Sequence, residues 1–502
     1  MVTLHKARYL ILCLLIALST PADFAQSTTA PEVINVNAAA PSHPFPHFWE
    51  EMFGSGRAVL SLRDSYRQDL RDVKQITGFQ YVRFHAIFDD DIGVYRQGSD
   101  GRPRYNFSYV DQIYDGLLAN GVKPFVELSF MPTQLAAKPL FQAFWYKPNV
   151  SPPRDWQAWD ALIAAFVQHL VARYGIDEVA SWYFEVWNEP NIDFWAGDPK
   201  QATYFDLYDH TAQAIKKVDS RLRVGGPATA QAAWVDVFIQ HCAANHIPLD
   251  FVSTHVYAND TALDVFGTTE TIPRDQMVCR AVGKVHNQIR SSKMPALPLI
   301  WSEFNASYKN EPDVTDSVYM GPWLADTIRQ CDGLVDIMSY WTFSDVFEEQ
   351  GVVETPFYGG FGLITAGGIP KPSYQAFKIL HLLGDLRIAL ASDSAVLTRR
   401  SDGTLALAVW NYAPPGEAGP SKDVTLRFQN ANVQHATIWR LDEDHGNVHR
   451  EYTKLGEPRY PTQAQIQALR SSEAITPQAE DVKNGSLTLE IPSHGLVLIE
   501  LQ

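Results

Sequence analysis

Eight short apolar runs separated by longer segments most constrain the fold of this 502-residue chain. The runs lie at residues 51–53, 81–84, 123–128, 182–186, 223–225, 251–254, 299–302 and 338–340. Residues 155–174, between the third and fourth runs, carry apolar residues at helical spacing, which predicts an amphipathic helix. Alternating strands and helices predict a parallel sheet closed into a (β/α)8 TIM barrel over residues 46–378. A doubly wound open sheet is the alternative, but the first run is not followed by the glycine-rich fingerprint of such folds.

The pattern changes after residue 378, where short alternating runs separated by turn residues replace the helices. These runs lie at residues 395–400, 404–410, 423–428, 436–441, 486–491 and 495–501. They predict an all-β, sandwich-like accessory domain over residues 379–502. Residues 32–37 (EVINVN) also alternate. The N-terminal segment 26–45 is therefore expected to add a strand to this β-domain.

Basic side chains at the start of the chain precede an apolar run at residues 9–18, which ends in small and turn-forming residues. This order predicts a secretory signal peptide over residues 1–25, with Ala22, Ala25 and Ala30 as candidate cleavage points. The run is too short for a transmembrane helix, which needs roughly 20 residues. We therefore expect a secreted or periplasmic protein that is free of the membrane once the signal is removed. A frayed N-terminal helix is the alternative.

The cysteines are few and widely spaced. Cys13 would leave with the signal peptide, and Cys242, Cys279 and Cys331 remain. No CxxC pair is present, so the sequence predicts neither a zinc site nor a redox motif. One disulfide is compatible with this set, but the sequence does not specify its partners, and the three thiols are expected to be chemically inert.

The composition restricts the class of ligand. The formal net charge is -16, which argues against binding to the phosphate backbone of nucleic acids. Aromatic residues make up 12% of the chain. Acidic and aromatic side chains together suit a sugar site, although aromatic residues mostly build cores.

Two glutamates follow the fourth and seventh predicted strands. Residues 182–191 read WYFEVWNEPN and place Glu189 beside Asn188, while residues 299–307 read LIWSEFNAS and place Glu303 at the end of an apolar run. The carboxyl ends of barrel strands open into the active-site mouth, so both side chains are expected to meet there. A surface carboxylate is the alternative for any single glutamate, but the strand-end position of both argues against it.

Two carboxyl groups facing each other across a barrel mouth are what glycoside hydrolysis requires. One protonates the leaving oxygen, and the other attacks the anomeric carbon or activates water. Their surroundings must separate the two pKa values so that one group is protonated while the other is ionised. Such a reaction needs no cofactor, and no metal-ligand spacing is seen.

The motifs resemble glycoside hydrolase family 39, and within it the bacterial β-xylosidases. The stretches that carry the resemblance are GSGRA (54–58), YVRFHAIFDDD (81–91), PFVELSFMP (124–132), FEVWNEPN (184–191), RVGGPA (223–228), WSEFNAS (301–307), SYWTFSDVFEE (339–349) and GGFGLI (359–364). The β-domain segments LTRRSDGTLALAVWN and DEDHGN also fit. WNEP alone would mark only the wider superfamily, whereas this combination is specific.

The resemblance implies a role for each matching residue. Glu189 matches the acid/base, Glu303 the nucleophile, and Asn188 the residue that hydrogen-bonds the sugar 2-hydroxyl. The other implied sugar contacts are His85, Phe130 as an aromatic wall, Trp341 as a stacking platform, the carboxylates Glu348 and Glu349, and His255 and Tyr257. For each of these seven residues a purely structural role is the alternative.

The resemblance therefore implies a retaining, exo-acting β-xylosidase that releases xylose from the non-reducing ends of xylo-oligosaccharides. It leaves open an α-L-arabinosidase side activity, an α-L-iduronidase-like activity and an endo-acting polysaccharide hydrolase. From other classes, a secreted carbohydrate-binding protein with an inactive barrel and a surface interaction module also compete. The presence of both Glu189 and Glu303 argues against these, because an inactive relative usually loses one of the pair. The sequence does not indicate an oligomeric state.

Overall fold

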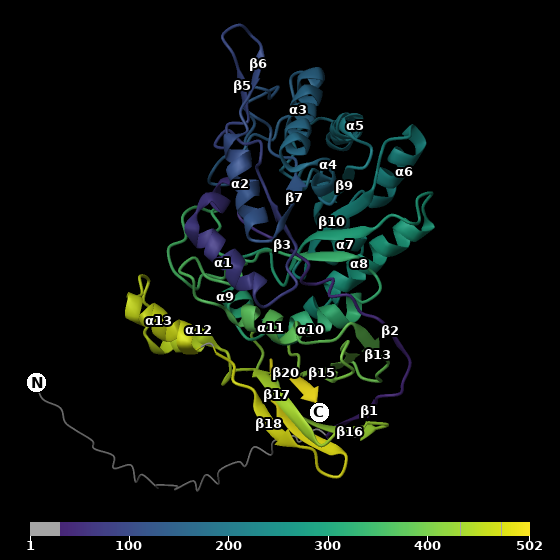
Figure 1. Cartoon of the computed structure of the whole chain (residues 1–502), viewed down its shortest axis with the longest axis vertical. Coiled ribbons are helices and arrows are strands. Elements are labelled where there is room, and N and C mark those ends of the chain that lie inside the picture. Colours follow the sequence, from purple (N-terminus) through teal and green to yellow (C-terminus); the bar gives the residue numbers. More distant parts are fainter. Residues whose placement is uncertain (1–30, 432, 473) are drawn as a thin grey trace, which may run out of the picture.

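The computed structural model describes residues 31–431, 433–472 and 474–502, so the predicted signal peptide lies outside the described residues. The described chain forms a closed parallel barrel with a β-sandwich packed at one end (Figure 1). The predicted fold class is confirmed. None of the described helices is both long enough and apolar enough to cross a membrane.

All eight barrel strands overlap the apolar runs of the sequence. The strands are β3 (Met52–Gly54), β4 (Tyr81–Phe84), β7 (Lys123–Glu127), β8 (Tyr183–Glu185), β9 (Arg223–Thr229), β10 (Phe251–Tyr257), β11 (Leu299–Asn305) and β12 (Ile337–Tyr340). Each pairs in parallel with its neighbours, and β9 pairs with both β8 and β10. The fourth and seventh barrel strands of the sequence pattern are therefore β8 and β11.

Helices surround the barrel and follow its strands (Figure 1). They are α1 (Asp64–Lys74), α2 (Ser108–Ala119), α3 (Trp156–Tyr174), α4 (Ile176–Val179), α5 (Lys200–Val218), α6 (Val235–Asn245), α7 (Ala262–Phe266), α8 (Arg274–Ser291), α9 (Pro312–Thr315), α10 (Met320–Cys331) and α11 (Pro372–Leu380). The predicted helix is α3, and the side chain of Asp155 caps it by accepting from the backbone N–H groups of Gln157 and Ala158. α11 continues to Leu380, past the predicted domain limit at residue 378.

Short elements lie between the main ones. They are the 3-10 helices η1 (Ala58–Leu62) and η2 (Ala230–Ala232) and the hairpin of β5 (Tyr95–Gln97) and β6 (Pro103–Tyr105). Cys279 in α8 and Cys331 at the end of α10 form a disulfide, while Cys242 is free and buried. Cys279 and Cys331 are therefore the partners of the one disulfide that the sequence allowed, and their helices pack side by side.

The accessory domain consists of two sheets. One contains β1 (Glu32–Asn37), β16 (Lys422–Gln429) and β19 (Ser486–Ile491). The other contains β18 (Gln478–Asp481), β17 (His435–Leu441), β20 (Leu496–Leu501), β15 (Leu405–Trp410), β14 (Ala395–Arg399), β13 (Leu386–Ile388) and β2 (Ser42–Pro44). β1 pairs in parallel with β16, so the N-terminal segment joins the C-terminal domain.

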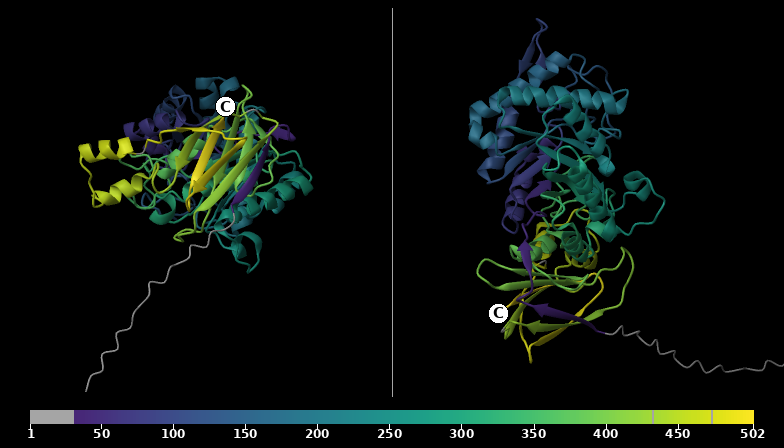
Figure 2. Two further views of the ribbon diagram at one scale, coloured as in Figure 1. Left: turned by 90° about the horizontal axis from the view of Figure 1, so that it is seen from below. Right: turned by 90° about the vertical axis from the view of Figure 1, so that its right-hand side faces the viewer.

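The larger sheet is buried on both faces. Along β15, Leu405, Leu407 and Val409 face the smaller sheet, whereas Ala406 and Ala408 belong to the barrel-side core. The sheet packs against α10 and α11 of the barrel, and the two further views place it at the end of the barrel (Figure 2). The sandwich therefore shares its core with the barrel. Helices α12 (Val448–Lys454) and α13 (Gln463–Ser472) lie in the segment between β17 and β18.

Candidate active site

The floor of the barrel is apolar and supports a layer of buried charge. Inward-facing residues from seven strands form the floor: Met52, Tyr81, Phe125, Tyr183, Phe251, Ile300 and Ile337. Two residues further along β4, β7 and β8, the chain places Arg83, Glu127 and Glu185, all buried. Because side chains alternate along a strand, these three also point into the barrel.

Arg83 organises this charged layer. Its guanidinium donates to Glu185 Oε2 at 2.6 Å and to Glu303 Oε1 at 2.6 Å, and it pairs with Glu127 Oε2 at 2.8 Å. It also donates to Asn188 Oδ1 at 2.9 Å. Burial lowers the pKa of Arg83, but the surrounding acidic groups outweigh burial and raise it above its ordinary value. Arg83 therefore remains a cation and fixes the position of Glu303.

Glu189 lies in the turn that follows β8. Its backbone φ is +43°, in the left-handed region, and its N–H donates to Ala228 O at 2.8 Å. Burial raises the pKa of Glu189 well above its ordinary value, and the nearby charges of Glu303 and Asp260 raise it further. These effects favour the protonated form of Glu189, which is the form that a general acid needs.

Glu303 is placed by a bulge between β10 and β11. The register of the two strands shifts between Thr254 and His255, so that His255 pairs with Glu303. Tyr257 donates to Glu303 Oε2 at 2.7 Å, and Arg83 binds the other oxygen. Both donors stabilise negative charge on this carboxyl group. Bulges often redirect side chains beside active sites, and here the shift turns Glu303 toward Glu189.

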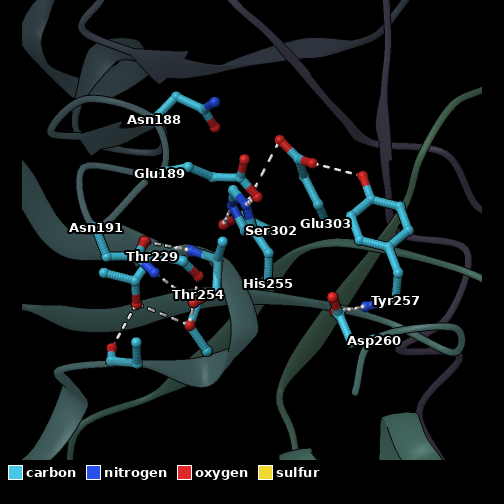
Figure 3. A network of polar contacts seen from close by, with 12 residues as sticks. Asn188, Glu189, Asn191, Thr229, Thr254, His255, Tyr257, Asp260, Ser302 and Glu303 are labelled. Atoms are coloured by element: carbon cyan, nitrogen blue, oxygen red, sulfur yellow. Dashed lines mark hydrogen bonds and ion pairs between the residues drawn. The ribbon is translucent and has the colours of Figure 1, made fainter. Parts of the chain in front are cut away.

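The carboxyl groups of Glu189 and Glu303 face each other, with His255 beneath them (Figure 3). One oxygen from each carboxyl and one nitrogen of His255 all lie within 4.8 Å of one another. Retaining glycosidases hold their two carboxyl groups about 5–5.5 Å apart, whereas inverting enzymes need about 6.5–9.5 Å. An approach of 4.8 Å or less between one oxygen of each carboxyl fits the retaining arrangement better than the inverting one.

His255 is fully buried and connects Glu189 with Ser302 on β11. Its Nδ1 lies 3.1 Å from Glu189 Oε1 and 3.7 Å from Glu303 Oε1. Its Nε2 lies 3.1 Å from Ser302 Oγ. Burial lowers the pKa of His255 well below its ordinary value, and the positive charge of Arg83 lowers it further. The imidazole is therefore neutral.

Two clusters among the described residues have donor sets that could hold a metal ion. One is Glu189, His255 and Glu303, where the Arg83 guanidinium already occupies Glu303 Oε1 and would repel a cation. In the other, formed by residues just before β3 and by the residue that ends α11, the Nδ1 atoms of His47 and His381 both bond Glu50 Oε1 at 2.7 Å. The polar contacts within each cluster are made without an ion.

A cavity of about 420 Å³ opens above the two carboxyl groups. It is lined by His85, Gln142, Phe144, Asn188, Glu189, Ile192, Phe194, Ala230, Gln231, Tyr257, Asp260, Glu303, Tyr308, Trp341, Glu349 and Phe361. The lining includes seven of the predicted site residues, namely His85, Asn188, Glu189, Tyr257, Glu303, Trp341 and Glu349. The predicted set therefore converges largely on one cavity.

Trp341 and Glu349 form one side of the cavity with His85. The rings of His85 and Trp341 lie 4.8 Å apart between centroids, and His85 Nε2 is 3.5 Å from Glu349 Oε1. Trp341 also packs on Gly54, where a Cβ atom would lie only 2.1 Å from the indole. Burial raises the pKa of Glu349 well above its ordinary value, and the charges of Glu303 and Glu189 raise it further.

Three predicted site residues are not part of the cavity lining. His255 lies below Glu189. Phe130 is fully buried behind the wall, where its ring stacks on Phe194 at 6.1 Å, so Phe194 takes the expected wall position. Glu348 is 2.6 Å from Arg63 and 3.6 Å from Arg57, and these ion pairs hold its carboxylate away from the sugar cavity.

Sequence reasoning missed the charged layer and part of the lining. Arg83, Glu127 and Glu185 stand inside otherwise apolar strand segments, and a charge in such a run is a signal of a polar barrel interior. The missed lining residues are Gln142, Phe144, Ile192, Phe194, Ala230, Gln231, Asp260, Tyr308 and Phe361. They come from loops and from the short 3-10 helix η2, where no periodicity indicates which side chains turn inward.

Comparisons with known proteins agree with this geometry. The chain is 37% identical over 489 residues to a β-xylosidase of Geobacillus stearothermophilus, covering 94% of this chain and 95% of the relative. It is 36% identical over 471 residues to a β-xylosidase of Caldicellulosiruptor saccharolyticus, covering 91% and 95%. A monomeric β-xylosidase from Caulobacter crescentus CB15 superposes with a TM-score of 0.85 at 36% identity, covering 94% of this chain and 99% of that structure. The sequence model of glycosyl hydrolases family 39 matches residues 32–487, and the chain belongs to that family.

Proposed function

We propose that this chain is a retaining, exo-acting β-xylosidase that releases D-xylose from the non-reducing ends of xylo-oligosaccharides. The observation that carries the proposal is the approach of the Glu189 and Glu303 carboxyl oxygens to within 4.8 Å, in surroundings that differ in charge. The names of the two bacterial relatives, each matched over more than nine tenths of this chain, support the choice of xylosides.

In this mechanism, Glu303 attacks the anomeric carbon while Glu189 gives its proton to the departing oxygen. The bond from the anomeric carbon to the leaving group breaks, and an ester to Glu303 forms. Glu189 is then ionised and removes a proton from the water that cleaves the ester. The sugar leaves with its β configuration retained, and both carboxyl groups return to their starting states.

The electrostatic differences between the two carboxyl groups support these roles. Burial and the charge of Glu303 keep the proton on Glu189. Arg83 and Tyr257 donate to Glu303 and hold it as a carboxylate aimed at the cavity. Asn188, whose Oδ1 accepts from Arg83, is held at the cavity surface, and we assign it the contact to the sugar 2-hydroxyl.

The shape of the cavity supports exo action. Its lining comes from the ends of β4, β8, β10, β11 and β12 and from the loops after β7, β8, β9, β10, β11 and β12. Walls on so many sides form a pocket for the end of a chain, whereas an endo-acting hydrolase needs a groove open at both ends.

An α-L-iduronidase-like activity would require a cation to neutralise the uronate carboxylate. Among the described residues, the cavity lining contains neither lysine nor arginine, and it contains the acidic side chains of Glu349 and Asp260. The nearby cation Arg83 is committed to Glu127, Glu185 and Glu303 beneath the pocket. This balance of charge favours a neutral sugar.

The test is the release of 4-nitrophenol from matched glycosides. We expect the largest kcat/KM on 4-nitrophenyl β-D-xyloside, a smaller value on the α-L-arabinoside and a much smaller value on the β-D-glucoside. Xylotriose labelled at its reducing end should first yield labelled xylobiose, as removal from the non-reducing end requires. Preference for another glycoside, or release of labelled xylose first, would contradict the proposal.

We further propose that the protein is exported, to the periplasm or outside the cell. The basic and apolar order of residues 1–25 supports this, as does the Cys279–Cys331 disulfide, because disulfides persist in oxidising compartments. The N-terminal sequence of the protein recovered from the native host tests the proposal. We expect it to begin between residues 23 and 31, and a chain that starts at Met1 would contradict export through a cleaved signal.

A further inference from the structure

A buried chain of polar groups connects Glu189 to Glu185 in the charged layer. From the cavity inward, Glu189 Oε1 lies 3.1 Å from His255 Nδ1, and His255 Nε2 lies 3.1 Å from Ser302 Oγ. Ser302 Oγ is 2.6 Å from Glu185 Oε1. His255, Ser302 and Glu185 are all fully buried, so no water competes for these hydrogen bonds. The positions of the protons along this chain decide how Glu189 is oriented.

A serine hydroxyl has one proton, so Ser302 cannot donate to both of its neighbours. If Ser302 donates to Glu185, it must accept from His255 Nε2, and the lone pair of Nδ1 then faces Glu189 and Glu303. If Ser302 donates to Nε2, the proton of the neutral imidazole is on Nδ1, and Glu185 must supply the proton between its own Oε1 and Ser302.

The surroundings of Nδ1 decide between these two arrangements. Nδ1 is 3.1 Å from Glu189 Oε1 and 3.7 Å from Glu303 Oε1, and Glu303 must be ionised to act as a nucleophile. A lone pair between two carboxyl oxygens is repelled, whereas an N–H there is attracted to both. An N–H at Nδ1 also leaves the acidic proton of Glu189 on Oε2, away from His255.

The balance of charge in the charged layer supports the same arrangement. Arg83 is the cation that contacts Glu127, Glu185 and Glu303, so three ionised carboxyls would leave a net charge of -2 in a buried layer. Such an uncompensated charge is costly, and protonation of one carboxyl relieves it. Glu185 is the member whose second oxygen contacts the hydroxyl of Ser302, and this hydroxyl also contacts His255 Nε2.

We propose that Glu185 is a neutral carboxylic acid that donates to Ser302, so that Ser302 donates to His255 Nε2 and His255 donates from Nδ1 to Glu189. Glu185 and Ser302 are positioning residues in this arrangement. It rests on the proposed function of Glu189 as the acid/base, and it explains how that group can keep its reactive proton facing the sugar.

The groups that face Glu185 are consistent with this state. They are Arg83 on β4, Glu127 on β7, Ser253 on β10, Ser302 on β11 and Tyr204 on α5. Burial raises the pKa of Glu185 above its ordinary value despite the lowering effect of Arg83. The charge of Glu127 raises it further, and the hydroxyls of Ser253 and Ser302 lower it without reversing the shift.

Glu127 is the matched control, since it contacts the same guanidinium but receives donors on both oxygens. Arg83 and His85 bond its Oε2, and Ser129 donates to its Oε1. The Ser129 oxygen also accepts from the backbone N–H of Ala86. Donors on both oxygens, including the Arg83 cation, stabilise negative charge on Glu127.

The first experiment reads the protonation state without using activity. The infrared difference between the native protein and Glu185→Gln at pH 7 should show the loss of a protonated carboxyl C=O stretch. The difference for Glu127→Gln should show the loss of a carboxylate stretch. Loss of a carboxylate stretch in Glu185→Gln would overturn the proposal, whether or not the native protein hydrolyses xylosides.

The second experiment reads the imidazole. In protein labelled with 15N-histidine, the signal of His255 is identified by its loss in His255→Gln. We expect Nδ1 in the shift range of a protonated nitrogen and Nε2 in that of an unprotonated one. The reverse assignment would also overturn the proposal.

The third experiment uses rescue by the conservative variant. An amide at position 185 can donate to Ser302 and accept from Arg83, as the neutral acid does. We expect Glu185→Ala to lower kcat/KM on xylobiose by about 100-fold or more, and Glu185→Gln to recover all but about tenfold of it. Glu127→Gln should give no such recovery relative to Glu127→Ala. Equal losses in Glu185→Ala and Glu185→Gln would count against a neutral donor at this position.

Discussion

Glu189 and Glu303 are the same amino acid in opposite electrostatic surroundings. Glu189 contacts the neutral His255 and is exposed to the charges of Glu303 and Asp260, which keep it protonated. Glu303 receives hydrogen bonds from the Arg83 cation and from Tyr257. The division of roles between the two carboxyl groups therefore depends on the residues that contact them.

Replacing Glu189 with alanine tests its role as the acid. Glu189→Ala should lower kcat/KM on xylobiose by about 10²–10⁴-fold, the usual contribution of general acid–base catalysis. The loss on 2,4-dinitrophenyl β-D-xyloside should be much smaller, because this leaving group departs without a proton. Steady-state kinetics on the two substrates check this, and equal losses would contradict the assignment.

The pH dependence follows from the raised pKa of Glu189. The acid form is present below that pKa and is lost as the pH rises through it, so kcat/KM on xylobiose should fall on the alkaline side. Asp260→Asn removes a negative charge that raises the pKa of Glu189. The alkaline limb should then move to lower pH, and a limb that moves to higher pH would show that Asp260 acts in another way.

Tyr257 provides a test of the nucleophile's surroundings. The phenol donates to Glu303 Oε2 at 2.7 Å, and burial raises its pKa well above the ordinary value, so its proton is retained at working pH. Tyr257→Phe removes one hydrogen bond to a charged group, worth about 1.5–3 kcal/mol. We expect kcat/KM on 4-nitrophenyl β-D-xyloside to fall by about 10–100-fold with the thermal midpoint nearly unchanged. An unchanged kcat/KM would show that this bond does not assist the reaction.

At this scale, the sequence predicted the residues whose place is set by strand ends. Glu189 and Glu303 follow apolar strands, and their meeting in the mouth follows from barrel geometry. Phe130 shows the limit of this reasoning, because the loop after β8 brings Phe194 between it and the cavity. Which aromatic ring reaches the surface depends on loop packing, which has no periodic signal.

Strand β3 shapes the cavity through Gly54, a residue that has no side chain. A Cβ atom on Gly54 would lie 2.1 Å from Trp341 Cε3, so the indole of the loop after β12 needs a glycine beneath it. The end of β3 thereby sets the position of Trp341, a cavity-lining residue that follows β12.

Gly54→Ala should displace Trp341 and raise KM for 4-nitrophenyl β-D-xyloside, and overpacking should cost about 1–3 kcal/mol of stability. Gly283→Ala in α8 is the control, since its Cβ atom would meet only Leu334 at 3.9 Å. In a helix this change should raise stability by up to about 1 kcal/mol. Thermal midpoints and KM values of both variants check the prediction. An unchanged KM in Gly54→Ala would show that the position of Trp341 does not affect sugar binding.

The long β and α elements were predictable because their patterns are strong. All eight barrel strands coincide with apolar runs, and β1 was visible as an alternating segment. The strands β2 and β13 pair with each other at one side of the larger sheet and were missed. They are as short as β3 and β8, but they contain polar side chains in place of an apolar run. Helices α12 and α13 were also missed, since they lie in a polar insertion between two strands.

Over the whole molecule, the sandwich and the barrel are one structural unit. Ile34 and Val36 of β1 are buried between the two sheets, and the larger sheet packs on α10 and α11. The N-terminal segment thus starts in the C-terminal domain before the chain enters the barrel. The β-domain is therefore expected to stabilise the barrel.

Deletion of residues 1–40, which removes β1, should destabilise the protein by about 3 kcal/mol or more, since two buried aliphatic side chains are lost. On heating, the activity and the circular dichroism signal of the folded state should then disappear together, at a lower temperature than in the native protein. Deletion of residues 1–25 is the control and should change neither. A deletion of β1 that leaves the midpoint unchanged would show that the barrel does not depend on this strand.

Trapping the covalent intermediate tests the role of Glu303 as the nucleophile most directly. Incubation with 2,4-dinitrophenyl 2-deoxy-2-fluoro-β-D-xyloside should add one fluoroxylosyl group per chain, and peptide mass spectrometry should locate it on Glu303. The Glu303→Gln variant should remain unlabelled. Label on any other residue, or hydrolysis with inverted configuration and no label, would contradict the claim that Glu303 is the nucleophile of a retaining glycosidase.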